Sequence, residues 1–140
     1  MKDLFLNKLV QREFYERFRK KLVVPQSFEE FDLICQFFTQ NENKASQTKY
    51  GHSIAMKTPL VTSCDFLPRY REQMLNQVAN PYQTALEQYK ASIRTSDQNK
   101  EKWWGDIVQE FAEGKTAMMT VFSNYSTVLA GQLQNDIDFG

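Results

Sequence analysis

The chain has only two cysteines and one histidine, and it lacks any long run of apolar residues. Cys35, Cys64 and His52 form neither a CxxC pair nor a His/Cys cluster, so the sequence does not indicate a zinc site. A transmembrane helix needs about 20 consecutive apolar residues, and we expect none here. Cys35 falls on an apolar helix face, which predicts burial, whereas a disulfide with Cys64 stays open for an exported protein.

An excess of one charge is also missing, because 17 basic residues balance 17 acidic ones. Nucleic-acid-binding proteins usually carry a basic excess, so we expect no nucleic-acid partner. The basic cluster at 17–21 stands beside Glu13 and Glu16, which favours a solvated helix face. Met1 is followed by a charged segment instead of the apolar core of a signal peptide. The sequence therefore shows no export signal, which is uninformative if it is an excerpt of a longer chain.

What the chain does contain is enough apolar surface for one domain. Its 140 residues include 14% aromatic side chains, which indicates a globular chain with a real core. We therefore expect a single domain over residues 1–140, of a mostly helical α/β class with two or three short strands. Apolar spacing predicts helices over about 4–21, 28–38, 64–71, 81–93, 104–113 and 126–133, and strands over 50–56, 116–122 and 137–139, with a polar loop over 39–48.

Several residues mark the expected ends of these elements. Ser27 with Glu30 fits a capping box at a helix start. Pro25 is expected to end the first helix, because the residue before a proline is pushed out of the α region. We expect Pro59 to break the chain, and Pro68 to kink or restart the helix that follows. Two further signals are Asn80 before Pro81 as a helix start and Gly114 as a helix end.

Three blocks of sequence resemble one known family. They are 22–31 (LVVPQSFEEF), 80–89 (NPYQTALEQY) and 105–125 (GDIVQEFAEGKTAMMTVFSNY). In this order they resemble the extracellular solute-binding proteins of the maltose/oligosaccharide type, which serve ABC sugar importers. The family often has Trp where Phe122 stands and Asp where Asn124 stands, so the match is incomplete at these two positions.

The resemblance implies a fold, a function and partners. Proteins of this family have two α/β lobes of the class II periplasmic-binding-protein fold, and all three blocks belong to the helical C-terminal lobe. The chain would then be a fragment that captures a sugar or oligosaccharide without catalysis and without a cofactor. Its partners would be the N-terminal lobe of the same protein and ABC permease subunits. Its location would be extracellular or periplasmic, with a lipid anchor on the full-length lipoprotein.

The segment after the strand at 116–122 carries the first group of candidate ligand-binding residues. Sugars are bound by flat aromatic faces and by planar polar side chains, and loops after strands often present such groups. The family places this loop at the ligand cleft. The alternative is a plain turn with an aromatic side chain in the core. The candidates are Phe122, Ser123, Asn124 and Tyr125.

A second candidate group is Phe66, Arg69 and Tyr70, where the family often presents an aromatic residue to the cleft. The alternative is core packing for Phe66 and a solvated Arg69. Trp103 and Trp104 are adjacent on a helix and point about 100° apart, so we expect one to face the core and one to be partly exposed.

Two rival functions come from other classes. A small helical interaction domain would use the Phe-rich helix faces to hold a protein partner. A small hydrolase would pair His52 with Cys35 or Cys64 as base and nucleophile, although no family signature surrounds either cysteine.

Overall fold

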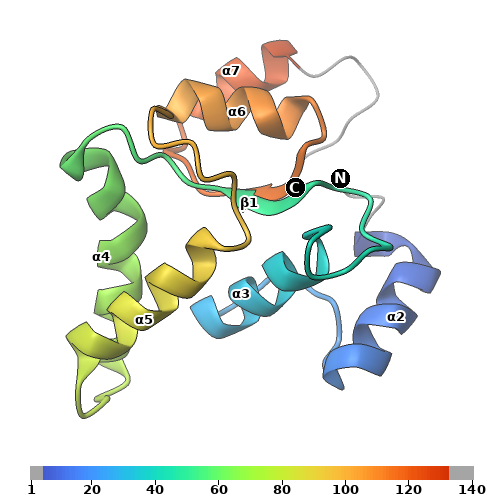
Figure 1. The fold of residues 1–140 in the computed structure, drawn as a ribbon, viewed down its shortest axis with the longest axis horizontal. Helices are drawn as coiled ribbons and strands as arrows, with labels where there is room; N and C mark the ends of the chain where they lie inside the picture. The colour runs from blue at the N-terminus through green and yellow to red at the C-terminus, as the bar shows by residue number, and fades with distance from the viewer. Residues whose placement is uncertain (1–4, 133–140) are drawn as a thin grey trace.

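A parallel pair of strands lies at the centre of the fold in the computed structural model, which describes residues 5–132. Strand β1 (Tyr50–Ser53) runs beside β2 (Thr116–Met119), with Tyr50 opposite Thr116. Parallel strands need a long crossover, and here the crossover holds three helices. Figure 1 shows this connection leaving β1 and returning above it.

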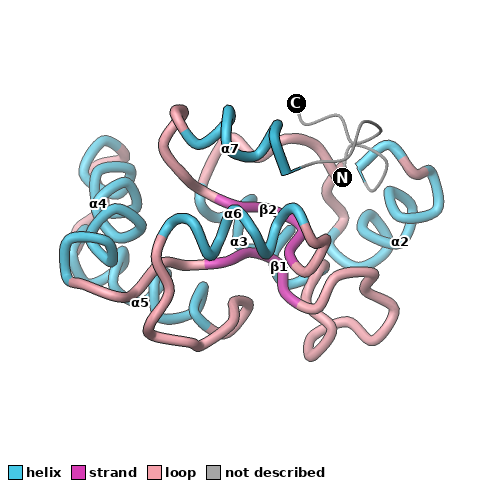
Figure 2. The backbone as a smooth tube through the Cα atoms, turned by 90° about the horizontal axis from the view of Figure 1, so that it is seen from above, coloured by secondary structure: helices cyan, strands magenta, loops and turns pink. Residues whose placement is uncertain are grey.

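Helices cover both sides of the strand pair. Figure 1 shows α3 on one side and α6 with α7 on the other, while α4 and α5 pack together at one end and α2 lies at the opposite end. Figure 2 shows the same separation of the α4/α5 pair from α2 when the molecule is seen from above. The chain is thus mixed α/β and mostly helical. The bounds are α2 (Lys8–Phe18), α3 (Phe28–Phe37), α4 (Pro59–Leu75), α5 (Pro81–Ile93), α6 (Trp104–Ala112) and α7 (Tyr125–Gln132). None of the described helices is both long and apolar enough to cross a membrane.

Two apolar clusters hold these elements together. The first joins α2 and α3 to β2, and its buried members are Val10, Phe14, Leu22, Ile34, Phe37, Phe38 and Ala117. The second, which we call the edge cluster, joins the segment after β1 to α4, α6 and the segment after β2. Its members are Ala55, Val61 and Ile107, with Trp104 and Val121 packed against them.

Close packing between α3 and β1 depends on Gly51. A Cβ atom at this position would overlap the backbone of Cys35 in α3. The Gly51 N–H donates to the Thr39 hydroxyl at 2.9 Å, so β1 is tied to the end of α3 by a hydrogen bond as well. Cys35 is fully buried, as its apolar spacing predicted, and both Cys35 and Cys64 are free thiols.

Two predicted helix ends are confirmed. The Ser27 hydroxyl accepts the Glu30 N–H at 3.2 Å, while the Glu30 carboxylate accepts the N–H of Gln26 at 2.8 Å in place of that of Ser27. Gly114 has φ +71° just after α6 and donates to the Phe111 carbonyl at 3.0 Å. A left-handed glycine at this position is how many helices end.

The proline-based predictions were less accurate. The first helix ends at Phe18, well before Pro25, because Arg19 adopts a left-handed conformation with φ 56°. Pro59 does not break the chain but begins α4, with the Thr58 hydroxyl accepting the first-turn N–H of Val61 at 3.4 Å. Proline suits the first helical position because the N–H it lacks would have no partner there.

Other boundaries differ by a few residues. Pro68 lies inside α4, which continues to Leu75 without a restart. Asn80 precedes α5, but its side chain makes no capping hydrogen bond. Both strands are shorter than predicted, while the 39–48 segment is irregular as expected. The strand predicted at 137–139 lies outside the described residues.

Candidate functional site

The carboxyl ends of β1 and β2 lie at the same edge of the sheet, because the strands are parallel. The chain leaves this edge after β1 to enter α4 and after β2 to enter α7. The start of α6 reaches the same edge, since Trp104 and Val121 both pack on the edge cluster. Ligands of open α/β sheets bind outside the carboxyl ends of the strands. A ligand of this sheet would therefore be expected at this edge.

Three aromatic rings form a continuous group at this edge. Phe122 stands nearly perpendicular to Trp104, with ring centroids 4.9 Å apart. Trp103 contacts Trp104 at 4.8 Å. Phe122 is 50% exposed and Trp103 37% exposed, whereas Trp104 is half-buried against the edge cluster. The expectation of one packed and one partly exposed tryptophan is confirmed. The alternative that placed Phe122 in the core is wrong.

Two hydrogen bonds to backbone carbonyls stabilise the turn that carries the polar candidate residues. The Tyr125 N–H donates to the Phe122 carbonyl at 2.9 Å, and the Ser126 hydroxyl donates to the Ser123 carbonyl at 2.7 Å. Ser123 and Asn124 are exposed, and Tyr125 is half-buried. The side chains of Ser123 and Asn124 form no hydrogen bond with the part of the chain that the structure describes. Both side chains are therefore open to solvent, and a role for them in ligand binding stays a prediction.

Arg69 occupies a different environment from the one expected. It is 2% exposed, and its guanidinium donates to both carboxylate oxygens of Asp32 on α3, at 2.7 and 2.8 Å. It also lies over the Phe28 ring at 4.5 Å. Arg69 is thus a buried link between α3 and α4, and the solvated alternative is wrong. Burial raises the pKa of Asp32, and the pairing with Arg69 opposes that rise.

Phe66 packs in an aromatic group between α4 and α5. Its ring lies 6.2 Å from Tyr70, 5.5 Å from Tyr82 and 6.2 Å from Tyr89. Among residues 5–132, no hydrogen bond, ion pair or ring contact joins Phe66 or Arg69 directly to the turn at 122–125. The two candidate groups therefore lie on separate elements, and a role in ligand binding for Phe66 or Arg69 stays a prediction.

Sequence reasoning missed Asp65, which directly precedes Phe66 on α4. Asp65 is half-buried, and its carboxylate makes no hydrogen bond or ion pair with the described residues. Burial raises its pKa from 3.8 to about 7, and the positive charge of Arg69 opposes that rise. One signal was present in the sequence. Val61, Asp65 and Arg69 recur every four residues, so a carboxylate stands on the inner stripe of a helix.

His52 and Cys35 are poorly placed for nucleophilic chemistry. His52 is 2% exposed, its Nε2 lies 2.9 Å from the Ser92 carbonyl oxygen, and its ring contacts Phe31 at 5.3 Å. Burial lowers the pKa of His52 to about 4 and raises that of Cys35 well above its usual range. The hydrolase alternative thus finds no accessible pair formed by these two residues. Nor do the described residues include three His, Cys, Asp or Glu side chains placed to hold a metal ion.

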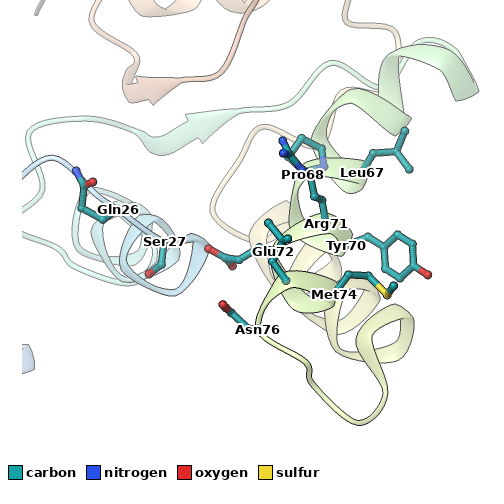
Figure 3. A pocket seen from close by; sticks show the side chains of 10 residues that line it. Gln26, Ser27, Leu67, Pro68, Tyr70, Arg71, Glu72, Met74 and Asn76 are labelled. Carbon is teal, nitrogen blue, oxygen red and sulfur yellow. The ribbon is translucent and has the colours of Figure 1, made fainter.

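A broad surface groove on the described part of the chain lies away from the carboxyl edge. It has a volume of about 990 Å³ and runs between the start of α3 and the second half of α4. Figure 3 shows Glu72 reaching toward the start of α3, where its carboxylate accepts the Phe28 N–H at 3.0 Å. Leu67, Met74 and Tyr70 line the groove, but Phe122 and its neighbours do not.

Comparisons of the chain with protein-family models, with curated proteins and with solved structures gave no match.

Proposed function

We propose that this chain is the C-terminal lobe of a solute-binding protein and forms one wall of a carbohydrate site. The observation that carries the proposal is the group at the carboxyl edge, where Phe122 is half exposed on Trp104. Beside it, Ser123 and Asn124 present polar side chains without partners in the described chain. The resemblance of three sequence blocks to the maltose/oligosaccharide type supports the same function.

The chemistry of these residues suits a neutral sugar. An exposed phenyl face can stack on the C–H side of a pyranose ring, and the Asn124 amide can both donate to and accept from ring hydroxyls. An unpaired polar group in such a site costs about 1–3 kcal/mol, which gives specificity for hydroxyl position. This function requires no nucleophile and no cofactor.

The proposed mechanism is a population shift. A sugar that contacts this wall and the N-terminal lobe at once favours the closed arrangement of the two lobes. The closed receptor then delivers the sugar to ABC permease subunits at the membrane. Under this proposal the full-length protein is extracellular or periplasmic and lipid-anchored.

Tryptophan fluorescence can test this proposal. Its only two tryptophans, Trp103 and Trp104, both belong to the aromatic group at the carboxyl edge. We expect neutral oligosaccharides to change tryptophan fluorescence with a Kd of about 1 mM or weaker, because a single wall supplies few contacts. Phe122→Ala and Asn124→Ala should each weaken this response several-fold.

Matched controls lie far from the edge. Tyr15 on α2 is 50% exposed, as Phe122 is, and Asn41 is an exposed amide in a turn. Tyr15→Ala and Asn41→Ala should leave the response unchanged. If no sugar in a broad panel alters the fluorescence at 100-fold excess over the expected Kd, or if all four variants behave alike, the proposal is wrong.

A helical interaction domain is the second candidate, and one feature favours it. Leu60, Leu67 and Met74 recur every seven residues along α4 and are 68%, 54% and 52% exposed. Such a row is what a protein partner would cover. This candidate predicts no sugar response, so the fluorescence titration separates the two functions.

A further inference from the structure

Helix α4 carries most of its apolar residues on its exposed face and polar residues on its buried face. Its buried residues are Val61, Arg69 and Gln73, of which only Val61 is apolar. Arg69 pairs with Asp32 on α3, and the Gln73 amide donates to the Gln88 side chain on α5 at 3.2 Å. A surface helix normally turns its apolar stripe to the core and its polar residues to water. The reversed pattern is what we expect of a helix whose outer face meets a partner.

The exposed face of α4 forms one continuous stripe, which we call the outer stripe. Its members are Leu60, Leu67, Pro68, Arg71, Met74 and Leu75. Its leucine and methionine side chains are all more than half exposed. Between Leu60 and Leu75 the stripe covers about 22 Å of helix axis, at about 1.5 Å per residue. A contiguous apolar surface of this kind is typical of an interaction site.

The groove of about 990 Å³ runs along the second half of this stripe. Every member of the outer stripe except Leu60 lines it, and Gln26 and Ser27 at the start of α3 form the facing wall. Figure 3 shows Leu67 and Met74 extending from one side of α4, while Glu72 extends from the other side toward α3. A groove bordered by an exposed apolar stripe is a typical seat for an amphipathic helix.

Arg71 is the only charged member of the outer stripe. It is exposed, and it forms no hydrogen bond or ion pair with residues 5–132. It lies one helical turn after Leu67 and one turn before Met74, so apolar side chains flank its charge on both sides. The other charged residue of the groove, Glu72, accepts the Phe28 N–H at the start of α3, where a carboxylate is favoured. The groove therefore offers a partner one free positive charge between apolar contacts.

We propose that the outer stripe and its groove bind an acidic amphipathic helix of another protein. Apolar side chains of that helix pack on Leu67 and Met74, and one Asp or Glu between them pairs with Arg71. This inference goes beyond the proposed sugar function and does not depend on it, because the turn at 122–125 does not line the groove.

A second copy of the chain fits this surface less well. The acidic residues of α4 are Asp65 and Glu72, and both lie outside the outer stripe. A second α4 would therefore bring another Arg71 and no carboxylate to pair with the first. A lipid surface also fits less well, because helices that lie on membranes present basic residues beside their apolar face. The outer stripe has one cation, and the polar face of α4 is turned inward.

The test is a fluorescence polarisation titration of the whole chain against labelled synthetic peptides of about 18 residues, which is long enough to span the stripe. The first peptide has Leu at every third or fourth position and one Glu at the centre of the Leu stripe. The matched peptide has Lys in place of that Glu. We expect a Kd of about 100 μM or tighter for the Glu peptide and about tenfold weaker binding of the Lys peptide.

Two variants and two controls assign the binding to the outer stripe. Arg71→Glu should reverse the preference between the peptides, and Leu67→Ser should weaken the binding of the Glu peptide about tenfold. Arg94→Glu at the end of α5 and Leu9→Ser on α2, which replace exposed residues far from the groove, should behave as wild type. The four replaced side chains are exposed, so each variant should keep the melting temperature of the wild type.

Several results would overturn the inference. Binding of neither peptide at about 1 mM would do so, and so would equal binding of the Glu and Lys peptides. Dimerisation in sedimentation experiments, or binding to vesicles of phosphatidylcholine and phosphatidylserine, would overturn it if Leu67→Ser abolishes that behaviour, because another occupant would then cover the stripe. The sugar titration is a separate readout. A missing sugar response overturns the proposed function and leaves this inference standing.

Discussion

Replacing Asp65 by Asn should make the protein more stable at high pH and leave it nearly unchanged at low pH. The folded chain holds the pKa of Asp65 at about 7, compared with 3.8 for the free side chain. The folded state therefore binds a proton that the unfolded state has already lost. It follows that this carboxyl lowers the free energy of unfolding as pH rises from about 4 to about 7, and the loss persists above that range.

The size of the effect follows from the shift. About three pKa units at about 1.4 kcal/mol each give an upper value of about 4 kcal/mol at pH 8. Asp65 is half-buried, so solvent screening reduces this, and we expect about 2–4 kcal/mol. Asn has nearly the shape of the protonated acid but cannot ionise. Urea unfolding of wild type and Asp65→Asn at pH 5 and pH 8 measures the difference directly.

Comparing the two proteins at each pH removes the contribution of other groups. His52, for example, has its pKa lowered to about 4, so its stabilising effect is lost as pH falls from about 6.5 to about 4. That loss is the same in both proteins and cancels. A stability difference that stays constant within about 0.5 kcal/mol between pH 5 and pH 8 would refute the view that Asp65 is a costly unpaired carboxylate.

Three further predictions concern buried residues away from the carboxyl edge. Arg69→Met should lower the free energy of unfolding by about 3 kcal/mol, because it leaves Asp32 without its partner, and Arg69→Met with Asp32→Leu should recover part of that loss in urea unfolding. Gly51→Ala should lower the melting temperature strongly, because the added Cβ would overlap the Cys35 backbone. Gly105→Ala in α6 is the matched control: its Cβ would enter open space, so the free energy of unfolding should rise by about 0.5–1 kcal/mol. The His52 ring protons, unique in the chain, should show no titration between pH 8 and pH 5.5 in NMR spectra.

Local signals predicted the parts of the fold that local chemistry controls. The Ser27 hydroxyl and Gly114 each act within a few residues, so their roles were readable from the sequence. Prolines were interpreted less accurately, because a proline disrupts the interior of a helix but favours its first position. Asn80 before Pro81 was interpreted as a helix start, yet Thr58 before Pro59 carries the same pattern and was read as a break.

Long-range pairing was not predictable in this way. Asp32 and Arg69 lie on different helices, and neither residue alone shows that their side chains meet in a buried ion pair. Only the tertiary arrangement of α3 and α4 decides that Arg69 is held inside and Phe66 packs on α5. The turn at 122–125 was predicted as a loop from local signals, because polar residues follow a short apolar strand there. Its role in ligand binding stays a prediction.

The distribution of paired and unpaired charges gives an argument for where a ligand binds. Lys102 is 4% exposed, yet its ammonium pairs with Glu110 at 2.7 Å and Asp97 at 3.0 Å. Arg69, equally buried, pairs with Asp32. These contacts show that the fold supplies partners to the charges it buries on α4, α6 and the loop before α6. Asp65 departs from this pattern one turn from the edge cluster, where stability alone would favour an apolar or paired residue. A carboxylate with a strongly raised pKa and no partner is a candidate functional group for this reason.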